Sequence, residues 1–152
     1  MKINLGCGFN RIPGYVNIDS SEEVKPDLVL NLDSPNFGFK HSFKIPISSD
    51  SVDEVMAIHV LEHIHNLIPL MNEIHRVLKS GGTLKIRVPH SHSLEAFQDP
   101  THVRFFNQNS WQYFTKEVAQ AFPGYGIKTD FEIKKNSVVG AENIVELEKR
   151  KV

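Results

Sequence analysis

The sequence contains one cysteine and no long run of apolar residues, which restricts both its compartment and its chemistry. Cys7 has no second cysteine for an internal disulfide, as is usual in a reducing compartment. A lone cysteine is more often a small packing residue than a nucleophile, so we assign it no catalytic role. No apolar segment is long enough for a secretion signal or a membrane span, and a cytoplasmic protein is expected.

Neither sign of charge dominates the sequence. There are 17 basic and 18 acidic residues, and the formal net charge at pH 7 is -1. Such a chain lacks the field that attracts nucleic acid or anionic lipid, so we expect a small-molecule substrate and neither a nucleic-acid nor a membrane partner. The 152 residues contain no repeat or linker, and residues 1–152 are predicted to form a single domain.

Strand-like segments alternate with helical periods along the chain, which is typical of an α/β sheet. Helices are expected over residues 67–78 and 110–122, where apolar residues recur every three or four positions. Gly81 and Gly82 are expected to end the first helix. Strands are predicted at residues 2–5, 15–19, 27–32, 52–58 and 83–88, followed by a closing hairpin that includes residues 131–133 and 144–147.

A glycine turn follows the first predicted strand, and an acid ends the second. The turn is Gly6-Cys7-Gly8 and the acid is Asp19. Glycine lets a ligand approach the backbone, and a carboxylate can accept both hydrogen bonds of a ribose diol. A Gly-x-Gly alone is more often a tight turn, and aspartate is common in turns. The pattern therefore indicates a nucleoside site only together with the rest of the chain.

A longer series of motifs resembles the class I S-adenosylmethionine-dependent methyltransferases, in a small, type-11-like variant. The resemblance covers roughly residues 2–89 and implies a Rossmann-like, mostly parallel sheet with a reversed C-terminal strand. It also implies S-adenosylmethionine as cofactor and methyl transfer as activity. The motifs are Asn-Leu-Gly-Cys-Gly at 4–8, Val-Asn-Ile-Asp at 16–19, Leu-Asn-Leu-Asp at 30–33, His-Val-Leu-Glu-His-Ile at 59–64 and Leu-Lys-Ser-Gly-Gly-Thr-Leu at 78–84.

The resemblance implies roles for individual residues. Asp19 matches the acid on the ribose hydroxyls, Asp33 the carboxylate that faces the adenine amino group, and His59 a position near the sulfonium. Asp33 can equally cap a turn. The loop along the methionine part of the cofactor is matched by Gly6, Cys7 and Gly8.

The chain departs from the family pattern in two ways. Asn4 and Asn10 stand where an acid and a third glycine are usual. The links at residues 9–14 and 20–26 are also too short for the usual crossover helices, so helices are reduced on one sheet face. We expect this face to expose an apolar patch. It would be covered by a second copy of the chain in a homodimer, or by the loop that carries Phe37, Phe39, Phe43, Ile45 and Ile47.

Histidines are concentrated in the middle of the chain, where seven of the eight lie between His59 and His102. Imidazole titrates near neutrality and suits a general base. His63, His102 and Asp99 follow the fourth and fifth strands and are the candidate catalytic residues, although loop histidines often only orient a ligand. Arg104 is interpreted as an anion clamp or as a partner of Asp99.

Two alternatives remain open. One is a nucleoside-binding module without catalysis. The other is a zinc-dependent hydrolase, because His59-Val60-Leu61-Glu62-His63 matches His-x-x-Glu-His. Its two histidines would have to share one helical face, whereas the pattern places His59 at a strand end. Since spacing identifies no third ligand, no metal site is predicted.

The favoured reaction is in-line displacement at the sulfonium methyl carbon, with the sulfur as leaving group. The site mainly has to position an already activated methyl donor away from water. Little sequence remains for a substrate domain, so the acceptor must be recognised by the loops at residues 34–50 and 89–107. Their mixture of aromatic rings with His, Asp and Arg fits a small polar metabolite or a carbohydrate.

Overall fold

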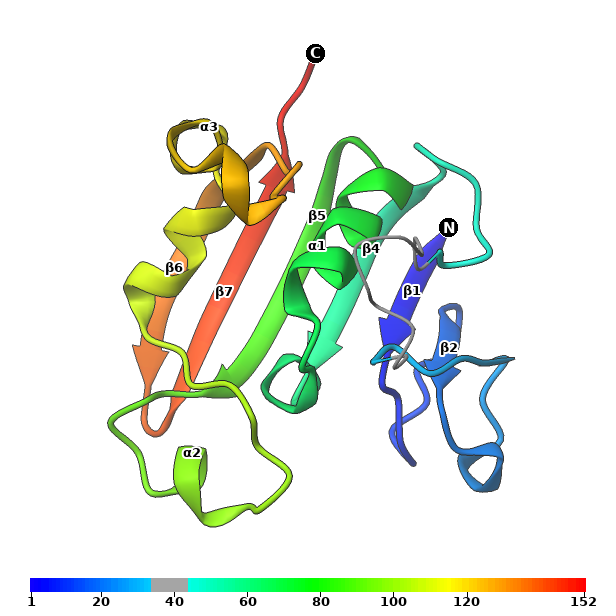
Figure 1. Ribbon diagram of the computed structural model, residues 1–152. Helices are drawn as coiled ribbons and strands as arrows, with labels where there is room; N and C mark the ends of the chain where they lie inside the picture. The colour runs from blue at the N-terminus through cyan, green and yellow to red at the C-terminus, as the bar shows by residue number, and fades with distance from the viewer. Residues whose placement is uncertain (34–43) are drawn as a thin grey trace.

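A computed structural model describes residues 1–33 and 44–152 (Figure 1). Within these residues a sheet of seven strands has the order β3-β2-β1-β4-β5-β7-β6. Strands β1 to β5 are parallel to one another, whereas β7 is antiparallel to its two neighbours, β5 and β6. The predicted Rossmann-like α/β fold with a reversed C-terminal strand is confirmed. The strands are β1 (Lys2–Leu5), β2 (Val16–Asp19), β3 (Leu28–Val29), β4 (Val52–Ile58), β5 (Leu78–Pro89), β6 (Phe131–Val139) and β7 (Glu142–Lys149).

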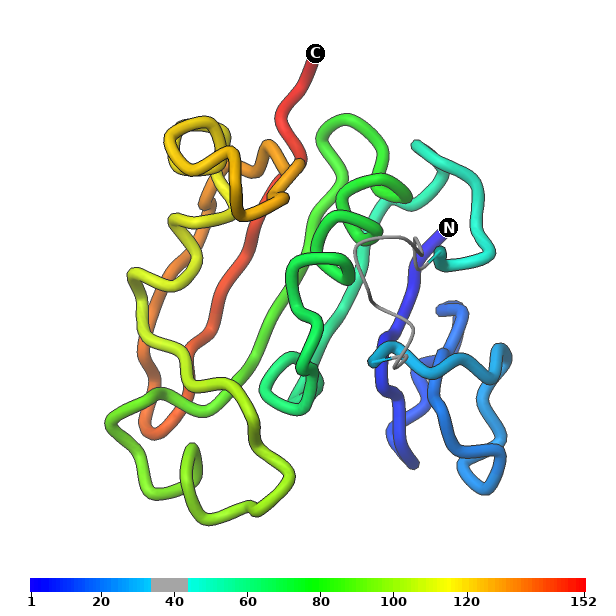
Figure 2. Tube along the Cα trace, in the orientation of Figure 1, coloured from blue at the N-terminus to red at the C-terminus, as the bar shows by residue number. Residues whose placement is uncertain are grey.

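The helices are few and short. Figures 1 and 2 show α1 (Leu67–Val77) and α3 (Lys116–Ala121) over the same face of the sheet. In the described part of the chain, none of the helices combines the length and apolar character needed to cross a membrane. The remaining helical segments are α2 (Glu95–Gln98) and the 3₁₀ turns η1 (Glu22–Val24), η2 (Leu61–His63), η3 (Gln108–Phe114) and η4 (Pro123–Tyr125).

The hydrophobic core lies between α1 and the sheet. The apolar stripe of α1 is buried because its residues recur every three or four positions, on one side of the helix. Alternate residues of the strands are buried with it. Burial of one such side chain contributes roughly 1.5–3 kcal/mol. The core includes Leu70, Met71, Ile74 and Val77 of α1, and Ile3, Leu5, Val55, Leu84, Ile86 and Leu147 of the strands.

The opposite face carries charged side chains, and the apolar patch expected there is absent from the described residues. Glu54 of β4 binds Lys85 at 2.6 Å and Lys2 at 3.6 Å, and Arg87 pairs with Glu142. Lys85 and Arg87 alternate along β5 with the buried residues of the core face, so the missing helices leave a polar surface. A homodimer stays a prediction, but it is not needed to cover apolar surface.

The expected covering loop lies only partly within the described residues. Phe37, Phe39 and Phe43 fall outside them. Ile45 is buried and Ile47 packs against the core, but Arg76 of α1 donates to both of their carbonyl oxygens, at 2.9 and 3.1 Å. This part of the loop therefore lies beside α1 and not over the polar face.

Three predicted boundaries were wrong. The third strand contains only Leu28–Val29. Helix α1 ends at Val77, before the two glycines, because Leu78 is already extended and pairs with Val52 of β4. The helix predicted over residues 110–122 is a 3₁₀ segment and a short α-helix, divided at the extended residue Thr115, which forms a β-bridge with Phe131.

Candidate functional site

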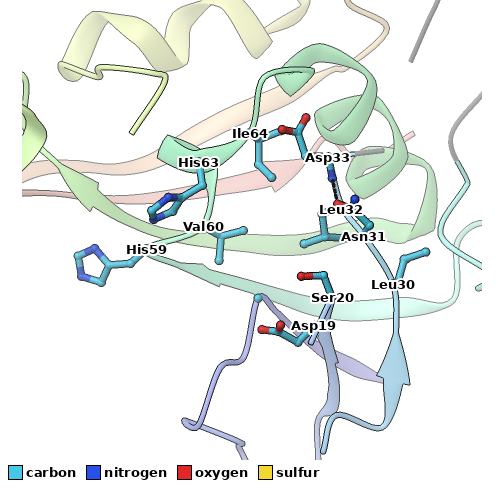
Figure 3. Close-up of a pocket in the computed structure, with 11 residues that line it drawn as sticks. Asp19, Ser20, Leu30, Asn31, Leu32, Asp33, His59, Val60, His63 and Ile64 are labelled. Carbon is cyan, nitrogen blue, oxygen red and sulfur yellow. Dashed lines mark hydrogen bonds between the residues drawn. The ribbon is translucent and has the colours of Figure 1, made fainter. Parts of the chain in front are cut away.

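A pocket of about 290 Å³ lies at the carboxyl ends of β1, β2 and β4 (Figure 3). Open parallel sheets bind their ligands at this edge, where the strand order reverses. The order β3-β2-β1-β4-β5 reverses between β1 and β4, next to the pocket. The lining consists of Gly6, Asp19, Ser20, Leu30, Asn31, Leu32, Asp33, His59, Val60, His63 and Ile64.

Five of the nine site residues expected from the sequence line this pocket. They are Gly6, Asp19, Asp33, His59 and His63. The other four, Cys7, Gly8, Asp99 and His102, are not part of its lining. Whether any of the nine contacts a ligand stays a prediction.

The glycine turn packs tightly against the residue that follows His59. Gly6 has φ +57°, which favours glycine, and a Cβ placed there would lie 2.5 Å from Cγ2 of Val60. Gly8 has φ +49° but no atom within 4 Å of its Cβ position. Between them, Cys7 is buried. Burial and then the charge of Asp19 raise the pKa of its thiol, which disfavours a nucleophilic thiolate.

Asp19 bridges the glycine turn and the turn after β2. Its Oδ2 accepts the Gly8 N–H at 2.9 Å, and its Oδ1 accepts the Ser21 N–H at 2.9 Å. Figure 3 shows the Asp19 side chain beside Ser20 at one side of the pocket, with Val60 and His63 on another segment. Each carboxylate oxygen has a further lone pair. Asp19 can therefore bind a ligand while it holds the turn.

Asn4, which departs from the family pattern, organises the short link after β1. It is 4% exposed, and its Nδ2 donates to the Asn10 carbonyl and to Asn17 Oδ1, both at 3.0 Å. Asn17 in turn donates through Nδ2 to Asp27 Oδ2 at 2.8 Å. A carboxylate at position 4 could not donate these bonds. This network holds a link that is too short to contain a crossover helix.

Asp33 lines the pocket and also fixes the start of α1. Its oxygens accept the backbone N–H groups of His65 and Asn66, at 3.0 and 3.1 Å, and Nδ1 of His65 lies 2.6 Å away. Burial alone would raise the pKa of Asp33, but the bonds from His65 and Asn66 outweigh it and lower the pKa. Asp33 thus caps the start of α1, whereas the turn before Ser34-Pro35 expected from the sequence lies outside the described residues.

His59 directly follows β4 and has a left-handed backbone conformation, with φ +54°. Its Nδ1 lies 3.3 Å from Glu62 Oε1, and its Nε2 lies 2.6 Å from Glu142 Oε1. Because His59 precedes a 3₁₀ turn, His59 and His63 do not share the face of an α-helix. The geometry required by the zinc-hydrolase alternative is therefore missing.

The three candidate catalytic residues do come together, through Thr101. The Thr101 hydroxyl donates to Asp99 Oδ1 at 2.7 Å and lies 3.0 Å from His63 Nδ1. The rings of His63 and His102 meet edge to face, with centroids 4.8 Å apart. The hydroxyl and the backbone N–H of Thr101 lower the pKa of Asp99, which favours its charged form. Arg104 is a brace and not a partner of Asp99, since its Nε donates to the Ile64 carbonyl at 2.9 Å.

A family model described as a methyltransferase domain matches residues 4–86, more than half of the chain. The chain belongs to this methyltransferase family. S-adenosylmethionine is the family's cofactor, so the predicted family, fold and cofactor class are confirmed. Every residue that lines the pocket falls within the range matched by the family model.

Relatives of this methyltransferase-family chain include an uncharacterised protein of Methanocaldococcus jannaschii, 32% identical over 107 residues. The match covers 64% of this chain and 45% of that protein, so this chain spans less than half of its relative's length. Two solved structures are similar in fold. An S-adenosylmethionine-dependent methyltransferase of Methanosarcina mazei has a TM-score of 0.63 at 15% identity, with 99% of this chain and 92% of that chain covered. One from Aquifex aeolicus has a TM-score of 0.59 at 17% identity, with coverages of 97% and 81%.

Sequence reasoning about this methyltransferase-family chain missed several pocket residues. Val60 and Ile64 lie beside the histidines in the matched motif, but their side chains carry no chemical signal. Ser20 and Asn31 adjoin the predicted acids, and proximity to Asp19 and Asp33 was the signal that could have found them. His75 of α1 is half-buried, and its Nε2 accepts the Asp130 N–H at 3.1 Å.

Proposed function

We propose that this chain binds S-adenosylmethionine in the pocket and transfers its methyl group, by in-line displacement, to a small polar or carbohydrate-type acceptor. One observation carries the proposal. The glycine turn and the Asp19 carboxylate meet at the carboxyl edge of the sheet, beside a pocket that Gly6 and Asp19 both line. This is where an α/β sheet of this order binds nucleotides.

The residues present fit the cofactor. Asp19 would hold the ribose hydroxyls, and Gly6 would let the ligand approach the backbone. An apolar surface suited to the adenine ring is supplied by Leu30, Leu32 and Ile64. The volume of about 290 Å³ is close to the lower limit of ligand sites, which span roughly 300–1,000 Å³. The remainder of the ligand would therefore extend along residues 6–8.

When bound, the cofactor supplies a methyl group on a sulfonium sulfur, which leaves with the electron pair of its bond to carbon as the acceptor attacks. The chain has to orient the acceptor and remove its proton. Because the hydroxyl proton of Thr101 is donated to Asp99, His63 must donate its Nδ1–H to Thr101. Nε2 of His63 then carries the free lone pair and can take the proton of an acceptor hydroxyl.

Binding is tested with S-adenosylhomocysteine by isothermal titration calorimetry. Asp19→Asn removes the charge from the bonds to ribose, each worth about 1.5–3 kcal/mol, so we expect affinity to fall about 10–100-fold. Asp53→Asn is the matched control, because Asp53 lies at the amino end of β4. Equal affinities for wild type and Asp19→Asn would contradict the proposed site.

Transfer is tested by measuring the formation of S-adenosylhomocysteine from S-adenosylmethionine in the presence of each member of a panel of hydroxylated acceptors. For an active acceptor, His63→Asn should lower kcat by about 10²-fold or more, the usual contribution of a general base. Binding of S-adenosylmethionine without turnover on any acceptor would favour the non-catalytic module. An unchanged rate in His63→Asn would remove His63 as the base.

A further inference from the structure

Three side chains beside the pocket form a cluster of metal-ligand type. One ligand atom each of Glu62, His63 and His102 lies within 4.8 Å of the others. His63 also lines the pocket, so the cluster adjoins the space proposed for the methyl donor. Glu62 and His63 belong to η2, whereas His102 comes from the loop after β5. The fold thus adds a ligand distant in sequence, His102, to Glu62 and His63, and the cluster does not include His59 of the sequence motif.

The hydrogen bonds of both histidines are made through Nδ1, which leaves Nε2 as the candidate ligand atom. Thr101 gives its own hydroxyl proton to Asp99, so His63 is the donor in the 3.0 Å contact between its Nδ1 and Thr101 Oγ1. His102 Nδ1 lies 3.0 Å from the Ala96 carbonyl, which can only accept. In its neutral form each ring therefore has an Nδ1–H bonded to oxygen and a lone pair on Nε2. The Nε2 of His102 also lies 3.7 Å from Oδ2 of Asp99. Metal-binding histidines are typically held in this way by a second layer of oxygen acceptors.

Glu62 supplies a buried carboxylate oxygen without a partner. The residue is 1% exposed, and its Oε2 forms no hydrogen bond within the described structure. Its Oε1 lies 3.3 Å from His59 Nδ1. A buried carboxylate oxygen that lacks a partner is costly, and a cation beside it would remove that cost. Glu62 is therefore an independent indication of a positively charged ligand at this place.

We propose that Glu62, His63 and His102 bind a divalent transition-metal ion whose open coordination positions face the pocket. Two imidazole nitrogens and one carboxylate oxygen suit Zn²⁺, Co²⁺ or Fe²⁺ better than Mg²⁺ or Ca²⁺, which prefer all-oxygen sites. Tetrahedral coordination at about 2.1 Å separates ligand atoms by roughly 3.4 Å, so atoms that are now up to 4.8 Å apart need to approach by at most about 1.4 Å.

The ion would also define the acceptor class, an inference that depends on the proposed methyl transfer. A metal with three protein ligands keeps positions for oxygen atoms of a substrate and lowers the pKa of a bound hydroxyl. The acceptor is then an oxygen chelator, such as a vicinal diol or a hydroxy acid. In the metal-bound state Nε2 of His63 is a ligand and not a base, and the ion takes over activation of the hydroxyl.

The test uses the whole chain, freed of any histidine tag and dialysed against a chelator, titrated with Zn²⁺ alone by calorimetry. We expect one equivalent to bind. Glu62→Gln and His102→Ala should weaken binding at least about 100-fold, since loss of an outer partner alone costs 10–100-fold. His92→Ala is the matched control, because His92 is exposed and outside the cluster. No binding, or equal binding in wild type, Glu62→Gln and His102→Ala, would overturn the proposal.

Two further measurements separate the possible failures. Co²⁺ added to the wild-type chain should give visible absorption bands of nitrogen and oxygen coordination, which tests the ligands even if a variant does not fold. Absence of these bands would overturn the metal site. Affinity for S-adenosylhomocysteine, measured without metal, tests the cofactor pocket by itself. Retained cofactor binding with no metal binding would refute only the present inference.

Discussion

Replacement of the first glycine of the turn by alanine tests how closely the turn and the pocket wall depend on each other. At Gly6 the new Cβ would lie 2.5 Å from Cγ2 and 3.2 Å from Cγ1 of Val60, which is 6% exposed and lines the pocket. Gly8→Ala is a matched control. Gly8 has a similar φ, +49° against +57°, but nothing lies within 4 Å of its Cβ position.

The expected loss of stability can be divided into two parts. A left-handed alanine costs about 1–2 kcal/mol, and the reduced freedom of the unfolded chain returns about 0.4–1 kcal/mol. Gly8→Ala should therefore lower the free energy of unfolding by about 1 kcal/mol. Gly6→Ala adds an overpacking cost of about 1–3 kcal/mol, for a total of about 2–4 kcal/mol. Affinity for S-adenosylhomocysteine should also fall, because the clash displaces Val60.

Urea unfolding measures both variants, and a double-mutant cycle isolates the clash. Val60→Ala removes Cγ1 and Cγ2 and leaves only Cβ, which lies 3.4 Å from the Cβ of an alanine at residue 6. The cycle of Gly6→Ala with Val60→Ala should thus show a favourable coupling of about 1–3 kcal/mol. Equal losses for Gly6→Ala and Gly8→Ala, or a coupling near zero, would refute the reasoning.

Three further predictions concern charge and pH. Burial, and then the charge of Lys149, lower the pKa of His75. The neutral imidazole therefore stabilises the fold above about pH 6.5, and this contribution is lost as the pH falls below that value. The free energy of unfolding of His75→Gln should accordingly depend less on pH below about pH 6.5 than that of the wild type. Arg76→Met should lower the free energy of unfolding by about 3 kcal/mol in urea titrations, because the buried Glu73 loses its cation. The hydrogen bond to Glu54 raises the pKa of Tyr15 to about 12. The unfolded chain therefore loses this proton at lower pH than the folded chain, and stability falls between about pH 10 and 12. Thermal unfolding of Tyr15→Phe should not show this loss.

Local signals in the sequence were enough for the parallel half of the sheet and for part of the site. The motifs placed Gly6 and Asp19 correctly at the carboxyl edge, because a strand followed by glycine or an acid is a local pattern. The polar sheet face could have been predicted as well, since Lys85 and Arg87 alternate with buried residues in β5. The prediction failed there because an absent helix was taken to imply apolar surface.

Long-range contacts explain what the sequence could not show. Nothing in the spacing of His63 and His102 indicates that their rings meet, because the loop after β5 reaches the end of β4 only through the parallel pairing of these two strands. The donor role of Asn4 likewise depends on Asn17, which belongs to the neighbouring strand. Both arrangements follow from strand order and register, and residue type alone does not encode them.

Hydrogen bonds join the loop that carries His102 to the turn that carries His63, and they fix the position of the metal-ligand cluster relative to the pocket. The backbone N–H groups of Val103 and Arg104 donate to the Glu62 carbonyl at 2.8 and 3.2 Å, and Arg104 also donates to the Ile64 carbonyl at 2.9 Å. Catalysis by positioning requires the acceptor group to be held against the methyl donor with little freedom. Because these bonds join the cluster to the pocket wall, an acceptor held by the cluster would keep its place relative to a cofactor held by Asp19.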